Sequence, residues 1–400
     1  MTHKLFPAAL LLLVACNQNP NNPNTEKMTY PQTRTDNTVD TYFGTQIADP
    51  YRWLEDDRSA ETAQWVKTQN TFTFAYLSKI PYRQTIKQKL EKLWNYEKIG
   101  APFTEGDYTY YYKNNGLQNQ SVLYRKDKND KEEIFLDPNT FSKDGTTSLA
   151  TIAFTQDGSL LAYLISEGGS DWRKGIVLNA KTKQVIGDTL VDIKFSGIAW
   201  KGNEGFFYSS YDKPQGSELS AKTDQHKLYY HQLNTPQKND ILIFGGKPTE
   251  KYRYVSGSVS NDGNYLFISA ANATSGNKLF VKDLTKPHAP LITITDTFDA
   301  DTNFINNQGT TLFLETNLNA PNGRLVKVEI TNPQPPHWQD VIPETPHVLS
   351  ISTAGKYLFA QYMVDALSQI KQYDYTGKLL REVQLPNIGT ASGFHAKKQK

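Results

Sequence analysis

Asn261-Asp262-Gly263-Asn264-Tyr265-Leu266-Phe267-Ile268-Ser269-Ala270 is the stretch that decides the fold, because versions of it recur along the chain. In each version, a turn that contains glycine precedes a short run of aromatic and branched apolar residues. The glycines of the six versions are Gly106, Gly158, Gly205, Gly263, Gly309 and Gly355. They are 52, 47, 58, 46 and 46 residues apart, and glycine supplies the positive φ that tight hairpin turns require. A period of about 50 residues with about four short strands is typical of a β-propeller blade.

Other apolar runs supply the remaining strands of each repeat, for example residues 122–136 and 370–383. A β-sandwich built from long hairpins is the alternative, but six periods of similar length favour the propeller. The same spacing places a seventh turn at about residue 405, and residues 391–394 read as the start of another strand. We therefore predict an all-β propeller of the seven-bladed type at residues 99–400, with an incomplete last blade.

Residues 59–97 carry a helical pattern instead of a strand pattern. Ser59 has a side chain that caps helices, and Pro81 interrupts the pattern. The second part places apolar residues on one face, namely Ile86, Leu90, Leu93 and Trp94. We predict two amphipathic helices within a segment at residues 30–98, and their apolar faces need a packing partner.

The amino terminus is typical of an export signal sequence. Residues 1–15 contain Lys4 and an apolar run that is too short to span a bilayer and typical of a signal peptide. Leu13-Val14-Ala15-Cys16 resembles a bacterial lipobox, in which the cysteine becomes the lipidated first residue. An ordinary signal peptide with an incidental cysteine is the alternative. We predict a lipoprotein signal peptide at 1–15, a lipidated Cys16 with a flexible tether at 16–29, and a membrane anchor facing the periplasm or the cell surface.

The composition excludes several classes of function. The 43 Lys and Arg residues against 41 Asp and Glu residues give a net charge of +2. This charge is too small to hold a polyanion, so we expect no nucleic-acid partner. Cys16 is the only cysteine, which excludes a disulfide framework and a cysteine-built metal site. The sequence has no H-E-x-x-H, P-loop or dinucleotide motif, and we expect neither a metal nor a cofactor.

The residues taken alone offer no nucleophile motif. The run nearest to a G-x-S-x-G elbow, residues 168–172, lacks the second glycine and reads as a turn. His226 and His231 are five residues apart on opposite faces of a strand, and we interpret them as surface or blade-packing residues. The cluster Glu55-Asp56-Asp57 has no spacing that argues for a glycosidase. Without further comparison, the sequence indicates a lipid-anchored propeller of unassigned activity.

Several long motifs resemble those of the prolyl oligopeptidase family of serine peptidases. Residues 49–56, DPYRWLED, resemble the family's amino-terminal D-P-Y-x-W-L-E-D motif, and residues 116–124, GLQNQSVLY, resemble its first-blade G-L-Q-N-Q-x-V-L-Y. Further similar stretches follow in the family's order at residues 135–139, 169–172, 194–200, 207–211, 226–231 and 392–394. The resemblance covers about residues 30–394 and is closer to the bacterial members of the family.

The resemblance implies a fold and an activity. Family members cleave short peptides after proline, and they pair a seven-bladed propeller with an α/β-hydrolase domain that carries a Ser, Asp and His triad. The resemblance then assigns residues 30–98 to the hydrolase domain and gives no residue of this chain a triad role. It implies a fragment that is inactive alone. The implied partners are short proline-containing peptides, the missing carboxyl-terminal hydrolase domain, and the membrane through the lipid anchor.

The resemblance also implies two substrate-binding residues. Phe195 matches the phenylalanine of K-F-S-x-x-A-W that lines an apolar substrate subsite, with blade core as the alternative role. Asp171 matches an aspartate that faces the interdomain region. Ala271 and Thr274 stand near positions where mammalian members carry Arg and Cys, so that part of the subsite does not carry over.

Three hypotheses therefore stand. The chain is a piece of a prolyl oligopeptidase, a standalone propeller that binds peptides or a partner without catalysis, or another propeller such as a surface carbohydrate-binding protein. An unfinished blade leaves a strand edge exposed, and the two helices lack a partner. Both points favour the first hypothesis.

Overall fold

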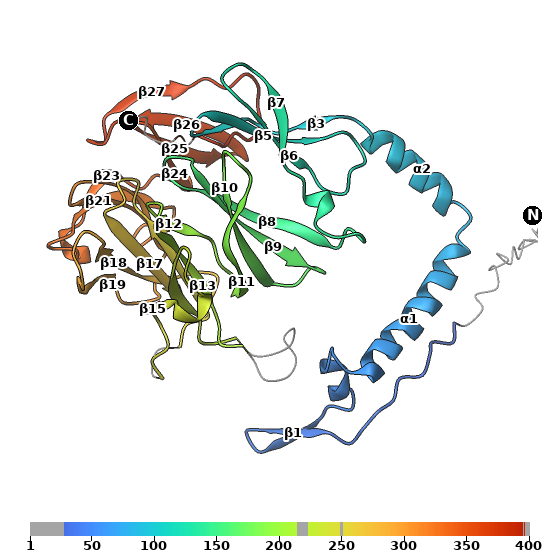
Figure 1. Cartoon of the computed structure of the whole chain (residues 1–400). Coiled ribbons are helices and arrows are strands. Elements are labelled where there is room, and N and C mark those ends of the chain that lie inside the picture. The colour runs from blue at the N-terminus through green and yellow to red at the C-terminus, as the bar shows by residue number, and fades with distance from the viewer. Residues whose placement is uncertain (1–27, 214–222, 249–250, 395, 397–400) are drawn as a thin grey trace, which may run out of the picture. The chain divides into compact units, whose positions relative to one another are not determined.

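A computed structural model describes residues 28–213, 223–248, 251–394 and 396 (Figure 1). The chain divides into two compact units, Met1–Ile86 and Lys87–Lys400, and each is described by itself. The predicted signal peptide and Cys16 lie outside the described residues. No helix in the described part is both long and apolar enough to cross a membrane.

The first unit contains a hairpin, a short 3-10 helix and a long helix. These elements are β1 (Val39–Tyr42), β2 (Thr45–Ala48), η1 (Arg52–Glu55) and α1 (Ala60–Ser78). Ser59 caps α1 as predicted, because its Oγ accepts a hydrogen bond of 3.0 Å from the Thr62 N–H. In the DPYRWLED motif, Arg52 bonds the carboxylates of Asp40 and Asp49. The motif therefore ties the hairpin to η1.

The break at Pro81 is also confirmed, because α1 ends at Ser78 and α2 (Arg83–Trp94) begins two residues after the proline. The apolar side chains of α2 are not covered. Their exposed fractions lie between 49% and 64% at Ile86, Leu90, Leu93 and Trp94.

The described residues of the second unit form a β-propeller of six antiparallel sheets (Figure 1). Sheet 1 contains β3 (Lys98–Ile99), β4 (Phe103–Glu105), β5 (Tyr108–Asn114), β6 (Val122–Lys126) and β7 (Glu132–Leu136). Sheet 2 contains β8 (Thr147–Phe154), β9 (Leu160–Glu167), β10 (Trp172–Asn179) and β11 (Val185–Lys194). Sheet 3 contains β12 (Ala199–Lys201), β13 (Gly205–Ser210), β14 (Lys227–Gln232) and β15 (Ile241–Phe244).

Sheets 4 to 6 repeat the four-stranded pattern. Sheet 4 contains β16 (Tyr254–Val259), β17 (Tyr265–Ala271), β18 (Asn277–Asp283) and β19 (Leu291–Thr295). Sheet 5 contains β20 (Thr302–Gln308), β21 (Thr311–Thr316), β22 (Arg324–Glu329) and β23 (Gln339–Ile342). Sheet 6 contains β24 (Leu349–Ala354), β25 (Tyr357–Val364), β26 (Leu367–Tyr373) and β27 (Leu379–Val383). Three short 3-10 helices lie between strands, η2 (Pro138–Thr140), η3 (Gln237–Asn239) and η4 (Pro335–His337).

The repeated glycines lie where the sequence predicts, between the first two strands of a repeat, with one exception. Five of them have a positive φ, namely Gly106, Gly158, Gly263, Gly309 and Gly355. In the third repeat, Gly202 makes the turn at φ +52°, and Gly205 is the first residue of β13. The assignment of Gly205 as the turn residue was therefore wrong. A Cβ at Gly205 would collide with the carbonyl oxygen of His231, so close strand packing accounts for this glycine.

In the described part of the propeller, five hydrophobic cores join the six sheets in sequence, each between two consecutive sheets. Alternate side chains of one strand enter different cores, because successive residues of a strand point to opposite faces. On β13, Phe206 packs with sheet 2 and Phe207 packs with sheet 4. Among the described residues, no such core joins sheet 6 to sheet 1.

The propeller prediction is confirmed, but the described residues form six blades and no part of a seventh sheet. The expected strand at residues 391–394 does not form. Only Ala396 makes an isolated parallel bridge, to Ala354 of β24, and Phe394 stacks on Phe359 with ring centroids 5.3 Å apart. The Ala396 bridge to β24 is a single pairing, whereas a strand needs several consecutive pairings, which accounts for the difference.

Candidate functional site

Phe195, the predicted substrate residue, lies directly after β11 and is 39% exposed. Its ring meets two tyrosines edge-on, with centroids 6.2 Å from Tyr211 and 5.8 Å from Tyr254. Tyr254 is 41% exposed and begins β16, whereas Tyr211 follows β13 and is buried. Phe195, Tyr211 and Tyr254 form what we call the aromatic patch. Because Phe195 is partly exposed, it is not a fully buried residue of a blade core.

The backbone of Phe195 is held in an unusual conformation. Its φ is +49°, a region that costs a non-glycine residue of order 1 kcal/mol or more and persists only where the surroundings impose it. Lys194 is buried, and its ammonium lies 5.3 Å from the Phe195 ring and 4.7 Å from the Trp172 ring. A cation above aromatic faces is attracted by their quadrupoles. The Lys194 ammonium therefore contacts both the Phe195 ring and the Trp172 ring.

His226 connects the residues beneath the aromatic patch. Its ring is 1% exposed, its Nε2 lies 2.9 Å from the Lys194 carbonyl oxygen, and its Nδ1 accepts a 2.7 Å hydrogen bond from the Val255 N–H. Since a carbonyl only accepts and an N–H only donates, the imidazole is neutral and carries its proton on Nε2. Burial lowers the pKa of His226 to about 4, although the bond to the Lys194 carbonyl opposes the shift.

Tyr211 is fixed at both ends. Its ring stacks on His226 with centroids 4.2 Å apart, and its hydroxyl donates to the Arg253 carbonyl oxygen. Burial raises the pKa of Tyr211 to about 12, so the hydroxyl keeps its proton at neutral pH. Tyr211 is therefore a rigid apolar wall and not a base.

Asp171 is placed at the same end of sheet 2 as Phe195. In the register of β10 and β11, Trp172 pairs with Lys194, so Asp171 and Phe195 are the next residues beyond this pair. Asp171 is exposed. The structure thus brings the two predicted substrate residues to one edge, and a role in substrate binding stays a prediction for both.

Sequence reasoning missed Tyr211, Tyr254 and the role of His226. His226 and His231 are both buried, so the blade-packing interpretation is confirmed for both and the surface alternative is wrong. His231 pairs through Nδ1 with Asp240 at 2.8 Å, and the Tyr208 hydroxyl donates to the same carboxylate. Ala271 pairs with Tyr254 across β16 and β17, which places it beside the aromatic patch.

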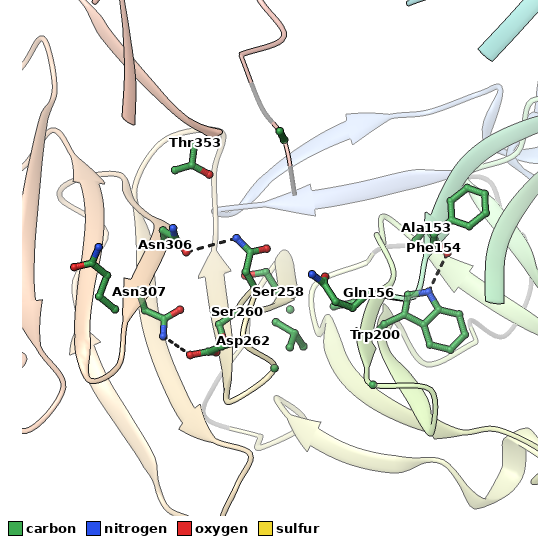
Figure 2. Close-up of a pocket in the computed structure, with 18 of the residues that line it drawn as sticks. Ala153, Phe154, Gln156, Trp200, Ser258, Ser260, Asp262, Asn306, Asn307 and Thr353 are labelled. Atoms are coloured by element: carbon green, nitrogen blue, oxygen red, sulfur yellow. Dashed lines mark hydrogen bonds between the residues drawn. The ribbon is translucent and has the colours of Figure 1, made fainter. Parts of the chain in front are cut away.

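A cavity of about 1260 Å³ runs along the innermost strands of sheets 2 to 6. Figure 2 shows that amide, hydroxyl and carboxylate side chains line much of it. Asn307 donates to Asp262 at 2.7 Å, and Asn203 donates in the same way to Asp157 at 2.7 Å. Each of these bonds links two neighbouring sheets beside a glycine turn. Burial would raise the pKa of Asp262, but bonds from Ser260 and Asn307 lower it below its usual range, so the carboxylate stays ionised.

Nothing in the described ranges points to metal chemistry, since no group of three or more His, Cys, Asp or Glu side chains there could hold an ion. The site offers the exposed ring of Phe195 and the carboxylate of Asp171 at the end of sheet 2, and the exposed ring of Tyr254 at the start of sheet 4.

Comparison with known proteins identifies the family. The sequence model of the prolyl oligopeptidase amino-terminal β-propeller domain matches residues 31–400. The chain belongs to the prolyl oligopeptidase family. Its resemblance to this family, first read from the motifs, is thereby confirmed.

The relatives are peptidases of this family. The chain is 56% identical to the prolyl endopeptidase of Elizabethkingia miricola and 54% identical to that of Elizabethkingia meningoseptica, each over 376 residues. Both alignments cover 94% of this chain and 53% of the relative. Among solved structures, prolyl oligopeptidase B from Galerina marginata bound to a 35mer hydrolysis and macrocyclization substrate is 28% identical with a TM-score of 0.80. That match covers 93% of this chain and 56% of the other. The chain thus spans about half the length of the relatives it matches.

Proposed function

We propose that this chain is the propeller portion of a prolyl endopeptidase, which cleaves short peptides on the carboxyl side of proline. The observation that carries the proposal is 56% identity over 376 residues to a protein of that name. In this proposal the chain gates and binds the substrate, and a hydrolase domain performs the cleavage. No triad role falls on any residue of the chain, so the chain alone is expected to be inactive.

The proposed division of labour follows from the chemistry of serine peptidases. A triad serine, activated by histidine, attacks the carbonyl carbon of the proline residue, and an oxyanion hole stabilises the tetrahedral intermediate. The propeller excludes folded proteins by size and shields the reaction from bulk water. The exposed rings of Phe195 and Tyr254 contact an apolar part of the peptide. Asp171 contributes a charge at the same edge.

Two features support a larger assembly. The exposed apolar side chains of α2 need cover, and we propose that residues 30–98 pack on the hydrolase domain. The absence of a core between sheets 6 and 1 in the described ranges leaves room for another sheet. We propose that the whole protein has a seven-bladed propeller, of which six blades are formed here. Each blade needs two neighbours to bury both of its apolar faces.

A fusion protein tests the proposed function. Residues 28–400 are joined to the part of the E. miricola enzyme that lies beyond the matched half, and turnover of a proline p-nitroanilide peptide is measured. We expect cleavage after proline that a serine-directed inhibitor abolishes, and no turnover by the unfused chain. The same peptide with alanine in place of proline is the control substrate. Turnover by the unfused chain, or a well-folded fusion without proline specificity, would contradict the proposal.

Cys16 is proposed as the site of lipid attachment in an exported lipoprotein. The support is its position after Leu13-Val14-Ala15 as the only cysteine of the chain. Acyl chains anchor by burying methylene groups at about 0.8 kcal/mol each. Cys16→Ser is therefore expected to move the protein from the membrane fraction to the soluble fraction of the native host. Retention of the variant in the membrane fraction would exclude lipid attachment at Cys16.

A further inference from the structure

We infer that His226 is a positioning residue for substrate selection, because it holds Phe195 and Tyr254 as the two exposed walls of one apolar subsite. The inference rests on the proposed function, since it explains how the proposed substrate site binds its peptide. The occupant of the subsite is an apolar group of the peptide, because the two partly exposed walls are aromatic rings.

The first wall depends on the Nε2 atom of His226. This atom donates to the carbonyl of Lys194, which is the peptide group immediately before Phe195. The bond orients that peptide group, and the orientation is what places Phe195 at φ +49°. In the absence of the bond, Phe195 is free to relax to a negative φ, which turns the ring away from Tyr254.

The second wall depends on the Nδ1 atom. It accepts from the Val255 N–H, which belongs to the peptide group immediately after Tyr254. The backbone N–H of His226 also donates to the Tyr252 carbonyl at 2.8 Å. These two bonds tie His226 to both sides of the short segment that carries Tyr254. One imidazole therefore sets the spacing between a residue at the end of sheet 2 and a residue at the start of sheet 4.

The floor between the walls is Tyr211, which stacks on the imidazole and meets Phe195 edge-on. A phenylalanine at position 226 would preserve this stack but would make neither hydrogen bond. The role of His226 is therefore separable from simple filling of the core. Packing alone requires a flat ring, whereas positioning requires a donor on one side and an acceptor on the other.

Three variants in the fusion protein separate these contributions. His226→Phe keeps the ring and loses both bonds. His226→Gln places an amide N–H near the original Nε2, and His226→Asn places a carbonyl oxygen near the original Nδ1. His231→Gln is the matched control, because His231 is an equally buried histidine of the same sheet that contacts Asp240 and not the aromatic patch.

Two substrates give the readout, Gly-Pro-p-nitroanilide and its benzyloxycarbonyl derivative, which adds an apolar group on the amino-terminal side. We expect His226→Phe to raise KM for the derivative about tenfold and to raise KM for Gly-Pro-p-nitroanilide less, because a lost apolar contact weakens binding by this order. His226→Gln and His226→Asn are expected to give smaller increases. Phe195→Ala should match His226→Phe, and the double variant should show no further loss.

Several results would overturn the inference. One is an unchanged KM in His226→Phe, and another is a loss that is equal for both substrates and shared by His231→Gln. If the unmodified fusion does not cleave after proline, the proposed function fails, and amide hydrogen exchange on the 400-residue chain then tests the positioning role. Faster exchange at Val255 in His226→Gln, with protection kept in His226→Asn, is the expected result. Equal exchange in both variants would refute it.

Discussion

Arg125→Met is expected to lower the free energy of unfolding by about 2–4 kcal/mol, because it leaves a buried carbonyl without its partner and removes a cation–π contact. Arg125 is 2% exposed and lies on β6. Its guanidinium pairs with Glu133 at 2.6 Å and donates to the carbonyl oxygens of Ala180 and Lys181 on sheet 2. It also lies 4.0 Å above the ring of Tyr108.

The size of this effect follows from what methionine leaves behind. Methionine fills most of the volume but donates no hydrogen bond, so the buried carbonyl of Ala180 loses its partner at a cost of about 1–3 kcal/mol. The cation–π contact and the link between sheets 1 and 2 are lost as well. Urea unfolding of the purified chain, followed by tryptophan fluorescence, measures the change.

Arg324→Met is the matched control for Arg125→Met. Arg324 lies on β22 and pairs with Asp340 at 3.0 Å, and both residues belong to sheet 5. A partly exposed pair of this kind contributes about 0–1 kcal/mol. Losses of equal size for the two variants would show that the inter-sheet bonds of Arg125 do not carry the stability assigned to them.

Local signals in the sequence predicted the elements of this fold well. The helix cap at Ser59 and the break at Pro81 each depend only on residues within one helical turn of that position, so the sequence alone predicts both. The turn at Gly263 likewise depends on its own φ. The third repeat shows the limit of such signals, because Gly202 and Gly205 are both candidates for the turn. Only the close approach of β13 to β14 distinguishes them.

The aromatic patch depends on contacts between residues far apart in the sequence, which no local pattern predicts. Phe195 and Tyr254 are 59 positions apart and meet only because sheets 2 and 4 flank sheet 3. His226 was predicted as a surface or blade-packing residue, and it is buried, with its two ring hydrogen bonds ending on backbone atoms. A hydrogen bond to a backbone atom does not require a particular residue type at the partner position, so no sequence pattern indicates it. Motif resemblance therefore indicated Phe195 as a candidate, while its contact with the neighbourhood of His226 became visible only in three dimensions.

Gly158→Ala is expected to lower the free energy of unfolding by about 2–5 kcal/mol, combining backbone strain and overpacking. Gly158 has φ +70°, so any side chain there is strained. A Cβ at this position would also lie 2.7 Å from both Glu105 C and Gly106 Cα. These are backbone atoms of the neighbouring turn, which cannot rotate away as a side chain can. The junction between sheets 1 and 2 has to open in order to relieve the contact.

Gly263→Ala separates the two costs, because Gly263 occupies the same turn position at φ +76° and a Cβ there would have no atom within 4 Å. The free energy of unfolding of Gly263→Ala is expected to fall only by the cost of the backbone strain, about 1–2 kcal/mol. Thermal and urea unfolding of both variants measure the difference. If the free energy of unfolding falls no more in Gly158→Ala than in Gly263→Ala, the glycines are required only for the conformation of the turns. A larger loss at Gly158 means that the repeated glycine also sets how closely adjacent blades approach, which a hairpin requirement by itself does not explain.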